Sequence, residues 1–459
     1  MLSNNLLRRT TLLIAIICGG VNVFAQHWAP LGVGVNNAIR SLYSDSTSNL
    51  LYVGGLFTKA GGNKSLAVAV WNGTTWDSLG GGANTGSPIL TFSKFNNQIY
   101  SVGEFEMNSE NYLARWNGVN WDTITKVKNV VGIKTIGNFL YVYGGFDSIA
   151  GIPASYIAKW DGTNWAAVDT THWQLSCIAD IITFQGNLYA TGNFANYNES
   201  IHQIAKWDGV KWQSVGGGFL GGTDWGNCFE IYNNELYVGG VFSKADGNPG
   251  NGIARWDGSA WYDVGGGISC CGGAQIVNML VFNSSLYAVG TFTNMSGVPA
   301  RFFSKWDGTK WCGFGSVFTT STSCLANYNG QLIIGGAFKS IDGDTLDSRI
   351  AKWIGGAYTD TCGFSVSVQE HPGFSSFEST LFPNPNNGSF QLMLKNLSGV
   401  QVEISVVDLV GRELYRSNET SNNSESLTRD IDLTAFPKGM YLLRVQNGLN
   451  VATDKVIIQ

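Results

Sequence analysis

Residues 159–165 read KWDGTNW, and the same phrase returns as KWDGVKW at 206–212, RWDGSAW at 255–261 and KWDGTKW at 305–311. Two tryptophans five residues apart flank an Asp-Gly pair, which favours a two-residue turn in which glycine supplies the positive φ. Such a turn places both indoles opposite each other on one face of a hairpin, where the pair adds about 0.5–1.5 kcal/mol. The phrase therefore predicts a recurrent hairpin clamp.

The tryptophan pair belongs to a longer repeat. Successive copies start 44 to 50 residues apart, and a second phrase, L-Y-x-x-G-x-F, keeps step with the first seven times, from LYVGGLF at 51–57 to LIIGGAF at 332–338. Each unit divides into four short strands joined by turn signals such as Asn233-Asn234. Four strands cannot bury both faces of their own sheet, so neighbouring units must stack.

Radial stacking of such units gives a β-propeller, and seven copies imply seven blades. The start of the chain also predicts how the ring closes. Trp28-Ala29-Pro30-Leu31-Gly32 matches the fourth-strand pattern W-x-x-(L/V)-G but lacks the three strands before it. We expect this orphan strand to complete the blade built from residues 323–353, which joins the two ends of the ring.

The order of these phrases resembles the kelch repeat, in which a strand ends in a glycine doublet and a tryptophan opens the fourth strand. The resemblance covers residues 28 to about 360, although the doublet is complete only in some copies, such as Gly239-Gly240 and Gly335-Gly336. The Gly-His signature of WD40 repeats is missing, and D-G-x-x-W differs from the D-x-G-x-T-W of sialidase Asp-boxes. The resemblance implies an all-β fold with a seven-bladed, kelch-like β-propeller.

Composition supports strands over helices. Charged residues make up 13% of the 459 residues, against about 25% in a typical soluble domain. Glycine is frequent, at 59, and there are 16 tryptophans. The net charge of −5 argues against nucleic acid as a partner.

The first 25 residues have the pattern of a secretory signal peptide. Arg8 and Arg9 precede an apolar stretch, and small residues end at Ala25. Cys18 follows Ile17, where a lipoprotein needs a small residue, so we reject lipidation. No later apolar run approaches the ~18 residues needed to span a bilayer, so we expect no transmembrane segment in the mature chain.

The sequence after the repeats divides into two parts. The propeller is expected over residues 26–360, followed by a Ser-rich linker at 361–378. Residues 379–459 alternate apolar and polar positions between turn signals, which predicts a small Ig-like β-sandwich.

Phrases in this last part resemble the C-terminal sorting domain of type IX secretion cargo. The matching residues are Pro383, Asn384, Pro385, Gly411, Gly439, Tyr441 and Lys455, in PNP, DLVG, FPKGMYLL and KVII. The resemblance implies export by Sec, then passage through the outer membrane by the type IX machinery. It also implies removal of residues 379–459 by a sorting peptidase, and release or attachment to surface lipopolysaccharide. The alternative is an ordinary Ig-like domain.

Candidates for catalysis are few. The chain has four histidines, His27, His172, His202 and His371, and they do not reproduce the copper-ligand set of kelch-like oxidases. The glycine triplets at 80–82, 216–218 and 265–267 lack the Lys of a phosphate-binding loop and fall at blade-to-blade connections. The turn aspartates of the opening phrase occupy a structural position; they are Asp161, Asp208, Asp257 and Asp307. We therefore name no catalytic residue.

Cysteines and a carboxylate-rich loop complete the survey. Seven cysteines follow the signal peptide, and an odd number leaves at least one thiol unpaired within the chain. They are Cys177, Cys228, Cys270, Cys271, Cys312, Cys324 and Cys362. Asp342, Asp344 and Asp347 form a partial calcium-loop pattern without its bidentate Glu. We expect no cofactor, with Ca²⁺ at these three residues as the alternative.

Departures from the repeat are the better guide to binding. In propellers the second-to-third-strand loops and the blade-to-blade connections share one face, which gathers variable loops there. Trp173 and Trp225 are the two tryptophans outside the repeat register, and both are expected in blade-to-blade loops. The other candidate ligand-binding residues are His172, Asp224, Tyr197, Glu199 and His202, the last three in the loop between Phe194 and Trp207. Exposed aromatic rings stack on sugars and anchor protein partners.

The leading hypothesis is a monomeric, non-catalytic binding or adhesion protein, secreted or attached to the cell surface. It recognises a glycan or a protein through its variable-loop face. The alternative is a secreted hydrolase or oxidase acting on polysaccharide, which carboxylates or histidines from three or more blades within hydrogen-bond reach at the axis would favour. A structural surface-layer component is a third reading.

Overall fold

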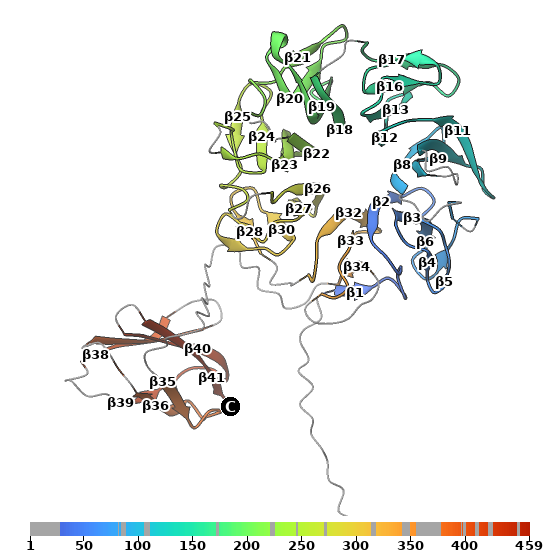
Figure 1. Cartoon of the computed structure of the whole chain (residues 1–459). Helices are drawn as coiled ribbons and strands as arrows, with labels where there is room; N and C mark the ends of the chain where they lie inside the picture. The colour runs from blue at the N-terminus through green and yellow to red at the C-terminus, as the bar shows by residue number, and fades with distance from the viewer. Residues whose placement is uncertain are drawn as a thin grey trace, which may run out of the picture. The chain divides into compact units, whose positions relative to one another are not determined.

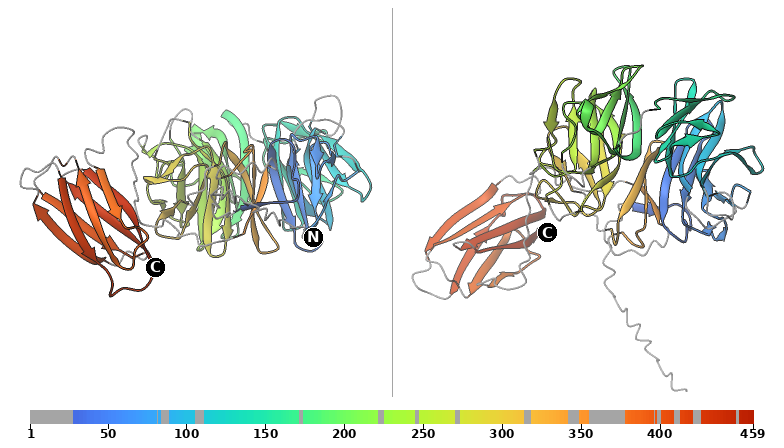
Figure 2. Two further views of the ribbon diagram at one scale, coloured as in Figure 1. Left: turned by 90° about the horizontal axis from the view of Figure 1, so that it is seen from below. Right: turned by 45° about the horizontal axis from the view of Figure 1, so that its top comes forward.

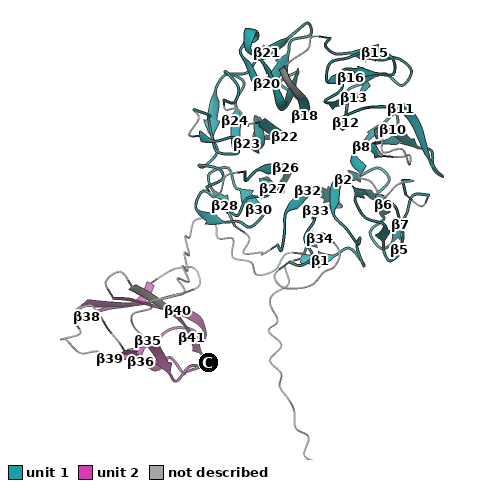
Figure 3. Cartoon of the chain, viewed as in Figure 1, with its two compact units in different colours: residues 1–366 teal, residues 367–459 magenta. Residues whose placement is uncertain are grey.

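The computed structural model describes most of the chain as two compact units, residues 1–366 and 367–459 (Figure 3). The described residues are 28–80, 82–83, 89–104, 111–170, 174–220, 225–244, 247–269, 273–313, 318–341, 349–354, 378–395, 397, 401–408, 413–420, 426–447 and 450–459. The predicted signal peptide lies outside these residues, as does the predicted linker apart from Glu378, which opens the first strand of the second unit, so the domain boundaries stay predictions. No helix in the described part of the chain is long and apolar enough to cross a membrane.

The first unit contains seven four-stranded antiparallel sheets, numbered here as blades 1 to 7. Blade 1 consists of β2 (Ile39–Asp45), β3 (Leu50–Gly55), β6 (Val68–Trp71) and β7 (Trp76–Asp77). Blade 2 consists of β8 (Ile89–Phe95), β9 (Gln98–Glu104), β10 (Asn111–Trp116) and β11 (Trp121–Lys126). Blade 3 consists of β12 (Val130–Ile136), β13 (Phe139–Gly144), β16 (Ile157–Trp160) and β17 (Trp165–Ala167). Blade 4 consists of β18 (Gln174–Phe184), β19 (Asn187–Asn196), β20 (Ile201–Trp207) and β21 (Trp212–Ser214). Blade 5 consists of β22 (Trp225–Tyr232), β23 (Glu235–Val241), β24 (Ile253–Trp256) and β25 (Trp261–Asp263). Blade 6 consists of β26 (Ile276–Phe282), β27 (Ser285–Gly290), β30 (Phe303–Trp306) and β31 (Trp311–Cys312). Blade 7 consists of β32 (Thr322–Tyr328), β33 (Gln331–Gly336), β34 (Ile350–Trp353) and β1 (Trp28–Pro30).

These sheets stand around a common axis, with the first strand of each blade innermost (Figure 1). The left view of Figure 2 shows the same ring edge-on, with its strands running along the axis. Three second-to-third-strand connections form small hairpins of their own: β4 (Lys59–Ala60) with β5 (Asn63–Lys64), β14 (Ser148–Ile149) with β15 (Ile152–Pro153), and β28 (Asn294–Met295) with β29 (Val298–Pro299). The all-β propeller expected from the repeat is confirmed.

The ring closes as predicted. β1 pairs with β34 in blade 7, with Trp28 opposite Trp353. Trp28 is buried, and its ring also meets the ring of Phe303 in blade 6, at a centroid distance of 5.5 Å. The second indole of the seventh blade thus comes from the beginning of the chain, which leaves the ring without an open seam.

The tryptophan pairs are cross-strand pairs in the third and fourth strands, as expected. Trp160 lies opposite Trp165, and Asp161 N donates to Asn164 O across a turn in which Gly162 has φ 103°. Across blades 1 to 6 the paired ring centroids lie 5.1 to 5.7 Å apart. The pairs therefore pack across the two strands of each hairpin, as the sequence predicted.

The structure adds a second role for the fourth-strand indole that sequence reasoning missed. Trp311 Nε1 donates to Val264 O of the preceding blade at 2.8 Å, and Trp261 Nε1 donates to Val215 O at 2.9 Å. Trp76 makes the same bond to Leu31 O, which follows the closing strand. Each of these indoles thus fastens its blade to the one before it.

The glycine triplets fit the same junction. Gly216 has φ 56°, and a Cβ there would lie 2.6 Å from Cδ1 of Trp261 in the next blade. Gly218 has φ 70°, and a Cβ there would lie 2.0 Å from His202 O in its own blade. The triplet is therefore a connector, as the sequence indicated.

The second unit is a β-sandwich with its own buried core. One sheet has the order β35 (Glu378–Phe382), β36 (Ser389–Lys395), β39 (Ser426–Asp432). The other has the order β38 (Glu413–Thr420), β37 (Gln401–Val407), β40 (Gly439–Asn447), β41 (Asn450–Ile458). β36 alternates buried and exposed residues along its length, as expected of a strand with one face in the core.

Candidate functional site

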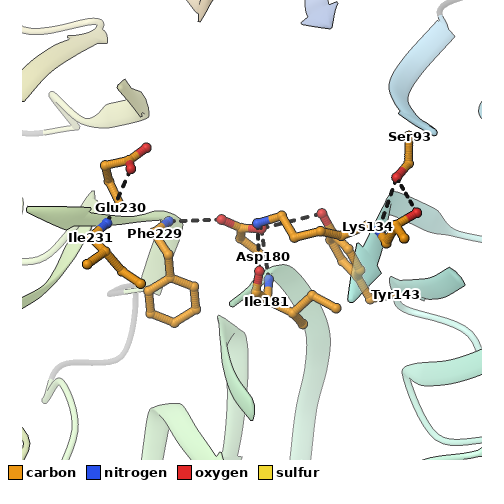
Figure 4. A network of polar contacts seen from close by, with 9 residues as sticks. Ser93, Lys134, Tyr143, Asp180, Ile181, Phe229, Glu230 and Ile231 are labelled. Carbon is orange, nitrogen blue, oxygen red and sulfur yellow. Dashed lines mark hydrogen bonds and ion pairs between the residues drawn. The ribbon is translucent and has the colours of Figure 1, made fainter. Parts of the chain in front are cut away.

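Two places in the propeller depart from the repeat, and the first is a polar network at the axis (Figure 4). Asp180 in β18 accepts from Phe229 N of the next blade at 2.9 Å through Oδ2. Its Oδ1 accepts from Nζ of Lys134 in the preceding blade at 2.8 Å, and Nζ also donates to Ile181 O. The Tyr143 hydroxyl lies 3.4 Å from the same Oδ1. Asp180 therefore joins blades 3, 4 and 5.

Similar bonds recur in blades without a charge at this place. Asn278 in β26 occupies the position of Asp180, one residue past a bulge, and its Oδ1 accepts from Leu325 N of the next blade at 3.0 Å. Asn227 Nδ2 likewise donates to Ile276 O at 2.8 Å. The innermost strands turn an unpaired edge toward the axis, and its N–H and C=O groups need partners. Asp180 is thus one of several side chains that hydrogen-bond one blade to the next.

Glu230 in β22 does not share that role. Its Oε1 accepts from its own neighbour Ile231 N at 3.3 Å, which is a long contact. Burial raises the pKa of this carboxyl to about 7, and the positive charge of Lys134 only partly offsets the effect. Glu230 is therefore a half-buried carboxyl that is partly protonated at neutral pH.

The second departure is in blade 4, where the end of β19, the start of β20 and their connection form residues 193–203, here called the blade-4 hairpin. Pairing between the two strands shifts register after Thr191 and then runs on to Asn196 opposite Ile201. A turn of 3-10 helix, η1 (Tyr197–Glu199), closes the hairpin. The inner strand β18 is also longer than in the other blades, with 11 residues. Blade 4 therefore extends its own sheet where blades 1, 3 and 6 make a separate small hairpin.

The blade-4 hairpin presents an aromatic side chain to solvent. Tyr197 is 58% exposed, and its ring lies against the His202 ring with centroids 5.4 Å apart. Glu199 pairs with Lys211 at 3.5 Å, but both side chains are exposed, so the ion pair contributes little stability. Ile201, between these groups, is buried and anchors the hairpin. The arrangement offers a supported aromatic surface flanked by polar groups.

The structure corrects two predicted positions. His202 lies within β20, opposite Ala195, and not in a loop. Trp225 is the first residue of β22, half-buried, with Nε1 donating to Asn227 Oδ1 at 2.8 Å, and does not lie in a blade-to-blade loop. Both differences arise because strands of blades 4 and 5 run further than the repeat indicates.

Other predicted residues have mixed outcomes. Tyr197 and Glu199 lie in the connection where we expected them, and the structure brings Tyr197 together with His202. Among the described residues no group of three or more His, Cys, Asp or Glu is placed to hold a metal ion. The residues that lie outside the described part are His172, Trp173, Asp224, Asp342, Asp344, Asp347 and Gly411.

The turn aspartates and the thiols have structural explanations. Asp161 Oδ1 accepts from Thr163 N and Asn164 N, and these bonds lower the pKa of its carboxyl. Cys177, Cys228 and Cys324 are free thiols, and burial raises the pKa of each, which makes a reactive thiolate unfavourable. Cys312 is disulfide-bonded.

In the sandwich the structure joins two of the predicted sorting motifs. Asn384, between Pro383 and Pro385, donates through Nδ2 to Lys455 O and accepts through Oδ1 from Ile457 N at 2.9 Å. Gly439 opens β40. Tyr441 is buried and donates to Pro437 O.

Comparison with known proteins assigns the second unit. Residues 380–459 match the secretion system C-terminal sorting domain. No curated protein matches the chain. The sorting domain marks the chain as cargo of type IX secretion, exported to the cell surface or released.

Solved structures similar to the chain are distant. PorZ of Porphyromonas gingivalis, an essential bacterial surface component of the type IX secretion system, is 12% identical with a TM-score of 0.44 over 92% of this chain and 59% of that chain. An acylaminoacyl peptidase of Pyrococcus horikoshii is 11% identical with a TM-score of 0.38 over 80% of this chain and 59% of that chain. An exo-β-1,3-galactanase of Phanerochaete chrysosporium is 12% identical with a TM-score of 0.28 over 92% of this chain and 99% of that chain. At these values the likenesses carry no argument about function, and the chain spans about three fifths of PorZ and of the peptidase.

Proposed function

We propose that the propeller is a non-catalytic binding or adhesion module of this exported protein, and that it recognises a glycan or a protein through the blade-4 hairpin. The observation that carries the proposal is the solvent-exposed ring of Tyr197, held against His202 at the end of an extended sheet. A ring fixed by a second ring loses little conformational entropy when it binds. Aromatic platforms of this kind suit sugar faces and protein hot spots.

Neighbouring residues extend the proposed surface. Trp173 and His172 directly precede Gln174, which pairs with Ala195 beside the hairpin tip. Trp225, preceded by Asp224, begins the inner strand of blade 5. A Cβ on the next residue, Gly226, would lie 2.0 Å from Thr191 Oγ1 in blade 4, so the two blades abut there. These residues, with Glu199, complete the proposed binding surface.

The remaining expectations belong to the same proposal. We propose that the repeat is kelch-like, that residues 1–25 are a signal peptide, and that the exported chain is a monomer. The sorting peptidase then acts at the C-terminal unit. Ca²⁺ at Asp342, Asp344 and Asp347 stays an alternative to a protein without cofactors.

A polysaccharide-acting hydrolase is the second candidate, favoured by one observation. Glu230 has a pKa of about 7, in the range that suits a general acid or base. Asp180, the other carboxylate of the network, is engaged by Lys134 and Phe229 N. In that network the carboxylates come from two blades, 4 and 5, whereas carboxylates or histidines from three or more blades would favour the hydrolase.

The test is a screen of the full chain against arrays of glycans and extracellular-matrix proteins. We expect Tyr197→Ala to weaken binding about tenfold. Tyr262→Ala is the matched control, because Tyr262 is 42% exposed on β25 of blade 5 and packs on Arg255 of the same blade. Absence of binding, together with polysaccharide turnover that Glu230→Gln abolishes, would replace this proposal with the hydrolase.

A further inference from the structure

The outer edge of β41, the last strand of the sorting domain, is hydrogen-bonded to Asn384 and Asn386 of the same domain. β41 is the edge strand of its sheet, and its outward backbone groups lie at Lys455, Ile457 and Gln459. Besides the two bonds to the Asn384 side chain, Asn386 N donates to Ile457 O and Gln459 N donates to Asn386 O, both at 2.8 Å. Adding a strand to an exposed sheet edge is a common mode of peptide recognition. A partner cannot bind in this way along this stretch of β41, because its backbone groups are already hydrogen-bonded.

Beside that covered edge lies an exposed apolar surface on one face of the sheet. Met440 pairs with Ile457 and Leu442 pairs with Lys455, so these four side chains point away from the core. Val407 lies on the other side of Leu442 in β37. Met440 is 38% exposed. Further along the same face the side chains become charged, as in the pair between Arg416 and Glu403.

We propose that the outer face of β40 and β41, at Met440, Leu442 and Ile457 with Lys455, is the surface by which the sorting domain docks on a protein of the secretion machinery. The match to a sorting domain requires a surface that a partner recognises. Strand addition is blocked at the last residues of β41, and Met440, Leu442 and Ile457 place apolar side chains on the sheet face beside that stretch. The partner surface is an apolar groove with a carboxylate placed for Lys455.

Asn384 has a positioning role in this surface. Its side chain takes the place of a backbone amide along β41, which the flanking prolines cannot do because they lack an N–H. The two sorting motifs, some seventy residues apart in sequence, thus form one structural unit. The inference concerns export and does not depend on the ligand proposed for the propeller.

The experiment measures export of the full chain from a host with type IX secretion, as the ratio of exported to cell-retained protein. We expect Met440→Glu to lower that ratio about tenfold, as the loss of a hot-spot contact would. The matched control is Met393→Glu, because Met393 is also a methionine, is also 38% exposed and lies on β36 in the other sheet. Its export should stay within about twofold of the parent chain.

A second variant guards against misfolding. Lys455→Glu reverses an exposed charge without touching the core, so it decides the test if Met440→Glu lowers the thermal midpoint. The proposal is overturned if Met440→Glu and Lys455→Glu are exported like the parent chain, or if Met393→Glu fails equally. It is also overturned if the face proves to bind a second copy, shown by a dimer that Met440→Glu splits with export unchanged.

Discussion

Blades 4 and 6 share the repeat phrases, yet they fold the connection between their second and third strands differently. In blade 6 the connection returns as β28 and β29 and buries Met295 and Ala300. In blade 4 the strands run on and leave Tyr197 in solvent. The same connection thus buries its side chains in blade 6 and presents an aromatic side chain to solvent in blade 4.

A glycine accounts for much of this difference. The small hairpin of blade 6 turns at Ser296 and Gly297, with φ of 51° and 81°, a combination that favours glycine at the second position. Blade 4 reads YNESIHQ from Tyr197 to Gln203 and has no glycine there. Without that turn, the two strands of blade 4 continue to pair.

The largest expected effect separates a repeat tryptophan from the hairpin tyrosine. Trp311→Ala should lower the free energy of unfolding by about 3–5 kcal/mol, because it removes a large buried side chain and its bond to Val264 O. Tyr197→Ala should change it by less than about 0.5 kcal/mol, as for an exposed residue. Urea unfolding of both variants checks the difference, and equal losses would break the comparison between the two kinds of position.

A smaller effect is expected at the axis. Asp180→Ala leaves Phe229 N and Lys134 without their acceptor, at a cost of about 1–3 kcal/mol. Lys134 is more than a third exposed, so most of that cost comes from the backbone N–H. Asp180→Asn should recover most of the stability, since Asn278 performs the same task in blade 6. Thermal unfolding of both variants tests this role of the Asp180 hydrogen bonds. If Asp180→Asn is no more stable than Asp180→Ala, the charge of Asp180 itself stabilises the fold.

The smallest effect concerns pH. The pKa of Glu230 is raised from 4.5 to about 7 by burial, so the folded protein binds this proton more tightly than the unfolded chain. The resulting stability is fully present below about pH 4.5 and is lost as pH rises through 7. Glu230→Gln should remove this dependence and raise stability at pH 8 by about 1–2 kcal/mol relative to the parent chain. Melting curves at pH 5 and pH 8 test it; an unchanged pH profile would contradict the burial of this carboxyl.

Much of the architecture could be predicted from the sequence because the repeated phrases mark where the strands and turns lie. The tryptophan pairs, the Asp-Gly turns and the orphan strand at Trp28 all followed from periodicity and turn chemistry, and the structure agrees. The indole bonds between blades did not follow, since the carbonyls that accept them lie 45 to 47 residues away. Such bonds depend on how neighbouring sheets pack and not on the phrase itself.

The candidate site was harder to predict for the same reason. The residues of the blade-4 hairpin were recognised as departures from the repeat, but His202 and Trp225 were expected in loops and lie in strands. The absence of a glycine between Tyr197 and Gln203 was the available signal. Glu230 and Asp180 gave no signal, because their environment arises only when three inner strands meet.

The most direct test of the contrast between blades 4 and 6 is a graft. Residues 193–204 are replaced by residues 291–303, which connect the equivalent strands of blade 6. We expect a thermal midpoint within about 4 °C of the parent chain, and loss of binding to whatever ligand the full chain captures. Retained binding in a folded graft would contradict the assignment of recognition to the blade-4 hairpin.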